Sequence, residues 1–83
     1  MSESNNKKQQ DDGISVEEEI IELYLNHRPF SRENYLRWLQ LGLIYFHNAH
    51  LSLRTIETCE VIDKEDGMIA LILNSGEYYL PKP

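Results

Sequence analysis

The stretch from Ser31 to Leu53 constrains the fold most, because it is the longest helical candidate and it contains the only tryptophan. On a helical wheel its apolar residues fill about half of the circumference, which is wider than the ~100° arc that covers one neighbour. A helix with such a face needs more than one packing partner. The opposite face mixes polar residues with three large aliphatic side chains, those of Leu41, Ile44 and Leu51. These three are therefore expected on the outside of the helix.

Two helices are predicted in the first two thirds of the chain. Ser15 and Glu18 fit a capping box that begins a helix over residues 16–27. Pro29 disfavours helical geometry in Arg28, so this helix should end by residue 27. Ser31 is a suitable N-cap for a second helix over residues 32–53. The two are expected to form an αα-hairpin.

Three strands are predicted after the helices. Residues 55–62 are rich in β-branched side chains and carry no helical stripe, while 68–73 and 77–80 are short apolar runs separated by turn residues. Consecutive short strands of this kind predict a three-stranded antiparallel meander packed on the helices. The fold class is therefore α+β. The middle strand is apolar on both faces, so one of its faces has no obvious cover within the chain.

Residues 1–13 are predicted to be a disordered tail, and residues 14–83 to be a single small α+β domain. The tail has no aromatic or branched aliphatic side chain with which to offset the entropy of ordering. The single cysteine, Cys59, rules out an intrachain disulfide, which is typical of a cytoplasmic protein. The polar N-terminus does not resemble a signal peptide, and the apolar runs are far shorter than the ~20 residues of a membrane span.

The charge distribution limits the classes of partner. The chain carries a net charge of -6, which opposes phosphate binding and argues against a nucleic-acid partner. Residues 28–54 form the one segment with a net positive charge, and the side chains of Arg32, Arg37 and Arg54 within it point in different directions on the wheel. Two helices followed by a β-hairpin are nevertheless compatible with a winged-helix regulator, which is the first alternative function.

Catalytic and metal-binding patterns are weak. No set of nucleophile, base and oxyanion donors is present, so the chain is predicted not to be an enzyme, with no catalytic residue and no cofactor. His47 and His50 lie three residues apart on one predicted helix and could converge on a metal ion, but a closed zinc site needs four ligands. A metal-binding module is therefore the second alternative, and no metal ligand is assigned.

The apolar excess favours a protein-protein interaction or regulatory module, which we expect to act by binding and as a homodimer. Exposed apolar patches on small proteins mark association sites. The longest helix and the second apolar face of the middle strand are the expected association surfaces, and all the contact residues named lie on the helix. The predicted partner-binding residues are Arg37, Trp38, Leu41, Ile44, Tyr45 and Leu51.

Overall fold

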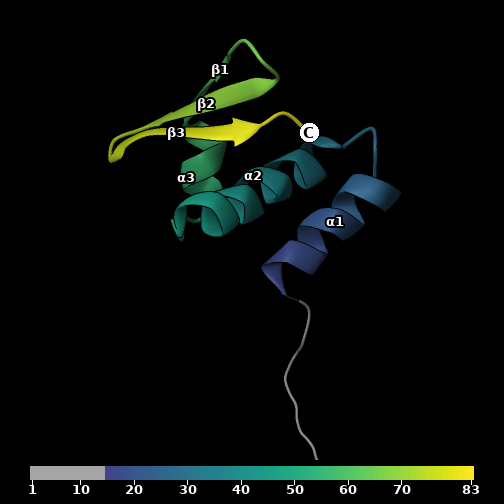
Figure 1. Ribbon diagram of the computed structural model, residues 1–83. Helices are drawn as coiled ribbons and strands as arrows, with labels where there is room; N and C mark the ends of the chain where they lie inside the picture. Colours follow the sequence, from purple (N-terminus) through teal and green to yellow (C-terminus); the bar gives the residue numbers. More distant parts are fainter. Residues whose placement is uncertain (1–14) are drawn as a thin grey trace, which may run out of the picture.

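Residues 15–83 are described by the computed structural model, and they form three helices followed by a three-stranded sheet (Figure 1). The predicted α+β class is confirmed, whereas the predicted tail lies outside the described residues. The helices are α1 (Val16–Asn26), α2 (Arg32–His47) and α3 (Leu53–Thr58). The strands are β1 (Glu60–Asp63), β2 (Met68–Leu73) and β3 (Gly76–Pro81).

Helix α1 begins with the predicted capping box. The Ser15 hydroxyl accepts a hydrogen bond from the Glu18 backbone N–H at 3.1 Å, and the Glu18 carboxylate accepts one from the Ser15 N–H at 3.2 Å. These bonds satisfy two backbone donors that the first turn of a helix leaves free. The helix ends at Asn26, one residue before the predicted end.

Helix α2 ends at His47, so the predicted single helix over residues 32–53 is wrong. Asn48 adopts a left-handed conformation with φ of 53°, and its N–H donates to the Ile44 carbonyl at 2.9 Å. The N–H of Ala49 donates to the Leu43 carbonyl at 3.0 Å. The Asn48 bond is that of the αL helix ending, a left-handed conformation that asparagine tolerates at low cost. The chain then turns away from the axis of α2.

The predicted strand over residues 55–62 is also wrong over most of its length. Ser52 caps α3, because its hydroxyl accepts a hydrogen bond from the Thr55 N–H at 3.2 Å. The short helix buries Ile56 in the core. Local capping and the burial of one aliphatic side chain therefore outweigh the β propensity of this segment. The first strand begins only at Glu60.

The sheet is the predicted antiparallel meander, with strand order β1-β2-β3. Val61 pairs with Leu71, and Leu71 pairs with Tyr78 on the other side. The β1–β2 turn uses positive φ at Asp66 and Gly67. The strand boundaries at residues 68–73 agree with the prediction, and β3 is slightly longer than the predicted 77–80.

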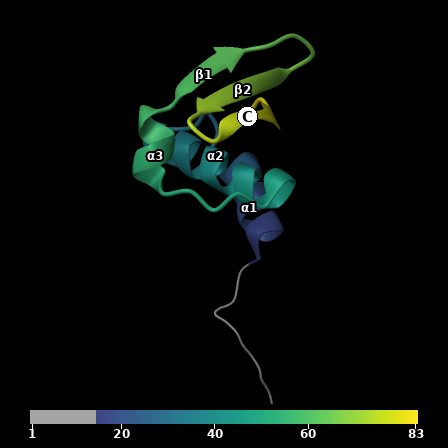
Figure 2. The same cartoon turned by 90° about the vertical axis from the view of Figure 1, so that its left-hand side faces the viewer.

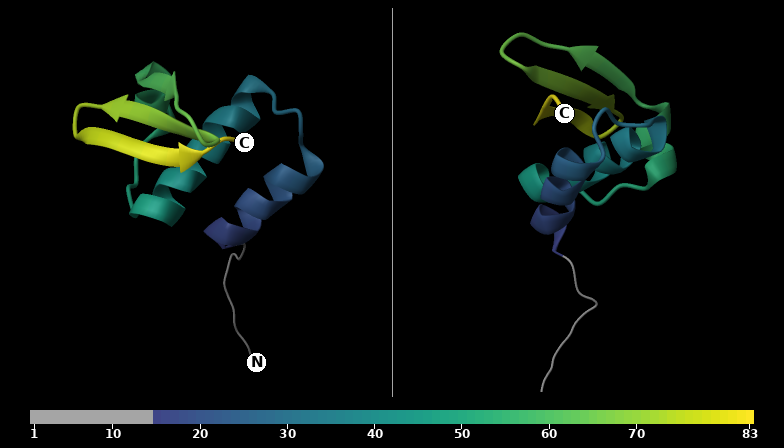
Figure 3. Two further views of the ribbon diagram at one scale, coloured as in Figure 1. Left: turned by 45° about the horizontal axis from the view of Figure 1, so that its top comes forward. Right: turned by 90° about the vertical axis from the view of Figure 1, so that its right-hand side faces the viewer.

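Helix α2 is the centre of the molecule, since α1, α3 and β3 all pack on it (Figures 1 and 3). The closest approach is at Gly42, where a Cβ would lie 3.3 Å from a Leu80 methyl. The expectation that α2 needs more than one cover is thus met by three elements. The buried apolar core consists of Leu23, Trp38, Leu39, Leu41, Leu43, Ile56, Ile69, Leu71 and Leu80.

Candidate interaction surfaces

Two of the predicted partner-binding residues lie in the core instead of on the surface. Trp38 is 4% exposed and Leu41 is 1% exposed. The expectation that Leu41 lies on an outer face is wrong, because α2 is enclosed by α1 on one side and by α3 on another. The indole Nε1 of Trp38 has no hydrogen-bond partner among the described residues. Within this fold, neither side chain can contact a partner directly.

The other four predicted residues do not form one patch. Ile44 and Leu51 are half-buried, and Leu51 packs against the core. Tyr45 is half-exposed near the end of α2, where its ring meets Phe46 edge to face with centroids 5.0 Å apart. Arg37 is engaged within the chain, since its guanidinium binds both carboxylate oxygens of Glu19 at 2.9 and 3.1 Å. Arg37 therefore ties α1 to α2.

A contiguous apolar surface lies on the face of the sheet that points away from α2, which we call the outer face. Cross-strand partners share a face, and Ile69, Leu71 and Leu80 face the helices because they belong to the core. The alternate residues of each strand must then point outward. The apolar residues of the outer face are Ile62 from β1, Met68, Ala70 and Ile72 from β2, and Tyr79 and Pro81 from β3.

The outer face has an apolar middle and a charged rim. Its central row runs Ile62–Ala70–Tyr79 across the three strands. Ile72 is flanked by Glu60 on β1 and Glu77 on β3, and the Lys64 ammonium lies 6.0 Å from the centre of the Tyr79 ring. An apolar centre with a polar rim is the usual anatomy of a protein interface.

No helix in the described part of the chain covers the outer face, since all three helices lie on the other side of the sheet (Figure 1). Ala70 is 0% exposed although it is not part of the core cluster. Tyr79 is 44% exposed, and Met68 and Ile72 are half-buried. The sequence-based expectation that the middle strand has one uncovered apolar face therefore agrees with the structure.

A second apolar surface is a stripe on α1. Ile21, Tyr24 and Leu25 follow helical spacing and are all exposed, with Leu25 at 72%. The Arg28 guanidinium lies 4.2 Å from the centre of the Tyr24 ring, which covers part of this stripe with a cation. The stripe lies on a different element from the outer face.

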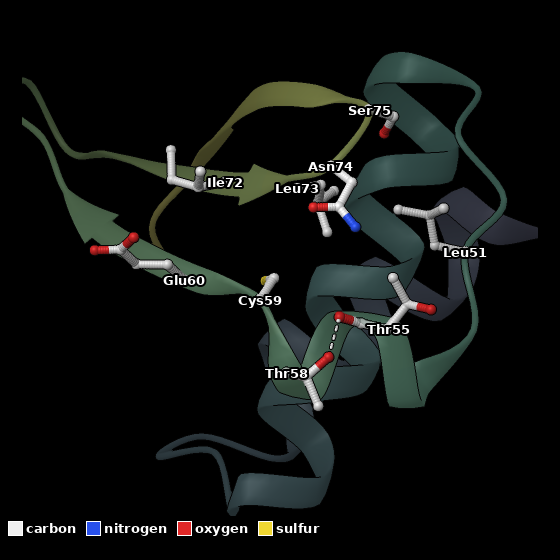
Figure 4. A pocket seen from close by; sticks show the side chains of 9 residues that line it. All are labelled: Leu51, Thr55, Thr58, Cys59, Glu60, Ile72, Leu73, Asn74 and Ser75. Carbon is white, nitrogen blue, oxygen red and sulfur yellow. Dashed lines mark hydrogen bonds between the residues drawn. The ribbon is translucent and has the colours of Figure 1, made fainter.

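Cys59 lines a pocket of about 280 Å³ between α3 and the end of β2 (Figure 4). The lining also includes Thr55, Thr58, Ile72 and Asn74, and it contains no histidine or lysine. Burial raises the pKa of the Cys59 thiol, although a backbone hydrogen bond partly opposes this. A thiol with a raised pKa is a poor nucleophile at neutral pH. The pocket gives no support to thiol catalysis.

Tyr35 lies beneath the inner side of β1, in a groove of about 500 Å³ that Val61, Asp63 and Lys82 also line. Burial raises the pKa of the Tyr35 hydroxyl, the ionised form of Cys59 and the Asp63 carboxylate raise it further, and Arg32 partly opposes this. The Lys82 ammonium binds the Asp63 carboxylate at 2.8 Å. The charged groups of this groove are thus paired with one another, without a convergent acid–base set.

The two histidines of the proposed metal alternative are not assembled into a site. His47 Nε2 is hydrogen-bonded to the Tyr79 carbonyl at 2.8 Å. Among residues 15–83, no group of three or more histidine, cysteine or acidic side chains has the arrangement to hold a metal ion. His47 instead connects the end of α2 to β3.

Comparison with protein-family models, with curated proteins and with solved structures gave no match. None of the described helices combines the length and the apolar character that crossing a bilayer requires. Function must therefore be inferred from the surfaces themselves.

The sequence carries a signal for the outer face, which is the apolar run over residues 68–73. The six apolar residues of β2 predict a strand with two apolar faces and an association surface on one of them, whereas the contact residues named from the sequence lie on α2 and, for Leu51, in the segment after it. Ile62 and Tyr79 complete the face only because the strand register sets them beside Ala70. That register depends on where β1 begins, which the sequence-based boundaries misplaced.

Proposed function

We propose that this chain is a small protein-binding module that acts by contact, without catalysis, and that it works as a homodimer in the cytoplasm. The observation that supports the proposal is the uncovered apolar outer face with its rim of Glu60, Lys64 and Glu77. Contiguous apolar patches with polar rims on small proteins mark association sites. The cytoplasmic location rests on the single free cysteine.

The magnitude of the available energy favours this proposal. Complete burial of an aliphatic or aromatic side chain contributes ~1.5–3 kcal/mol. The outer face is only partly exposed, so covering Ile62, Ile72 and Tyr79 recovers a fraction of that amount at each position. The sum is about 3 kcal/mol or less, which is smaller than the ~5–15 kcal/mol that separates folded from unfolded domains but large enough to measure. A partner on the outer face would therefore stabilise this chain measurably.

An affinity capture with the full chain as bait tests the proposal. Ile72→Lys places a charge on the middle strand of the outer face, between two glutamates that tolerate it. Leu25→Lys makes the same kind of change on the exposed stripe of α1 and is the matched control. We expect a partner that binds the unmodified chain and the Leu25→Lys variant but is lost with Ile72→Lys.

Circular dichroism and thermal unfolding should show that both variants remain folded. The proposal is contradicted if every captured protein is retained by Ile72→Lys. It is also contradicted if nothing is enriched over an unrelated bait of similar charge. Loss of the partner with Leu25→Lys alone would assign binding to α1 instead of the sheet.

A further inference from the structure

The two edges of the sheet differ in their capacity to pair with another strand. On β3, Pro81 has no backbone N–H to donate, and the outward carbonyl of Tyr79 is already bound by His47 at 2.8 Å. Proline and competing side chains are the usual means by which proteins block an edge. The β3 edge is therefore closed to a further strand.

The β1 edge is open. The Lys64 N–H donates to the Met68 carbonyl at 2.9 Å, so Lys64 faces β2. Because facing alternates along an antiparallel strand, Glu60 and Ile62 face β2 as well, and the backbone groups of Val61 and Asp63 point away from the sheet. All residues of β1 are exposed, and no described element lies beyond this edge (Figure 2). Val61 and Asp63 thus present unpaired donors and acceptors.

We propose that the β1 edge binds β1 of a second copy of this chain. The two strands run antiparallel, and a two-fold axis passes between Ile62 of one copy and Ile62 of the other. This inference rests on the proposed homodimer and names its surface. In this register Ile62 lies opposite Ile62 of the second copy, and Val61 lies opposite Asp63. The outward backbone groups of Val61 and Asp63 then bond to each other in two symmetry-related pairs. An interface that repeats under a two-fold axis closes on itself and does not propagate.

Charge complementarity selects this register. With Ile62 at the axis, Glu60 lies opposite Lys64 of the second copy on the outer face, and the symmetry repeats the pair. Opposite charges directly across two strands stabilise their pairing, whereas like charges oppose it. If Val61 lay at the axis instead, Glu60 would face Ile62 and neither charge would be matched. The sequence Glu60-Val61-Ile62-Asp63-Lys64 is self-complementary in one register.

This dimer joins the two three-stranded sheets into one continuous sheet. It also joins the two outer faces, because Ile62 lies at the end of the apolar row formed with Ala70 and Tyr79. The dimer therefore doubles the apolar surface that the proposed function offers to a partner. The helices of both copies stay on the opposite side.

Charge reversal tests the register in the full chain. Sedimentation equilibrium at tens to hundreds of micromolar should show a dimer. Glu60→Lys or Lys64→Glu alone should raise the dissociation constant about tenfold, since each creates two like-charge pairs. Combining both substitutions restores opposite charges and should return the constant to within about threefold of the original. Glu77→Lys changes a glutamate of the same face at the closed edge and should have no such effect.

A disulfide trap gives an independent reading of the geometry. In a Cys59→Ser background, Ile62→Cys should cross-link rapidly on oxidation, because opposed residues of a non-hydrogen-bonded pair have Cα atoms about 4.5 Å apart. Val61→Cys should not, since Val61 faces Asp63 and not its own copy.

A chain that stays monomeric at hundreds of micromolar overturns the inference, as does a double charge reversal no better than the single ones. Cross-linking through Val61→Cys in preference to Ile62→Cys would overturn the register. None of these results affects the capture experiment, which depends on Ile72. Failure of the dimer and failure of partner binding are therefore distinguishable.

Discussion

The two faces of β2 carry similar side chains in different surroundings. Ile69 and Leu71 on the inner face are buried in the core. Met68 and Ile72 on the outer face are only partly buried, and no described helix covers them. The difference shows that apolar side chains alone do not ensure burial. A face of the sheet is buried only where another element packs on it. This chain has helices for one face only.

Truncation on the two faces should give the largest contrast. Leu71→Ala removes a fully buried side chain, and we expect it to lower the free energy of unfolding by ~2–5 kcal/mol. Ile72→Ala, at the next position on the outer face, should cost less than ~1.5 kcal/mol, because its side chain is already partly solvated. Urea unfolding followed by tryptophan fluorescence measures both. Equal losses would mean that the outer face is a second core.

The contact between α2 and the inner face can be tested at Gly42, with the next largest effect. Gly42→Val should destabilise by ~1–3 kcal/mol, because the added side chain meets Leu80, whose methyl lies 3.3 Å from the Cβ position. Gly42→Ala is the matched variant. Its close contact is partly offset by a gain in helix propensity of ~1 kcal/mol, so its effect should be smaller.

Thermal unfolding of both Gly42 variants provides the measurement. If Gly42→Val is as stable as the unmodified chain, α2 and β3 pack less closely than the 3.3 Å contact between Leu80 and the Gly42 Cβ position indicates. If Gly42→Ala loses as much stability as Gly42→Val, the cause would instead lie in the backbone of α2.

Much of the architecture follows from local sequence signals. The capping box at Ser15 and the N-cap at Ser31 predict where α1 and α2 begin, and both are present. The turns around Gly67 and Gly76 predict the meander. These features depend on a few neighbouring residues, which is why sequence alone identifies them.

The remaining features depend on tertiary context. The end of α2 at Asn48 and the cap of α3 at Ser52 are local signals, but they compete with an apolar stripe that continues through Leu51 and Leu53. The burial of Leu41 depends on where α1 and α3 pack, which a helical wheel does not show. The outer face depends on strand register. The contact residues predicted from the sequence therefore lie on α2 and in the segment after it, whereas the uncovered apolar face lies on the sheet.

Tyr35 probes the inner side of the edge strand, and it should show the smallest effect. Burial, with the charges of Cys59 and Asp63, raises the pKa of its hydroxyl, and Arg32 partly opposes this. The folded chain therefore holds this proton more tightly than the unfolded chain does. The contribution to stability is unchanged below the unfolded pKa of about 10, and it declines as pH rises through the folded pKa.

Tyr35→Phe should accordingly make the alkaline loss of stability shallower, as measured by urea unfolding between about pH 9 and 11, on either side of the usual tyrosine pKa. Tyr24→Phe, on the exposed stripe of α1, is the control and should keep the original decline. Cys59→Ser should be combined with both, because burial also raises the pKa of that thiol. If Tyr35→Phe and Tyr24→Phe behave alike, Tyr35 is not shielded beneath β1. The inner side of this strand would then be as open to solvent as its outer side.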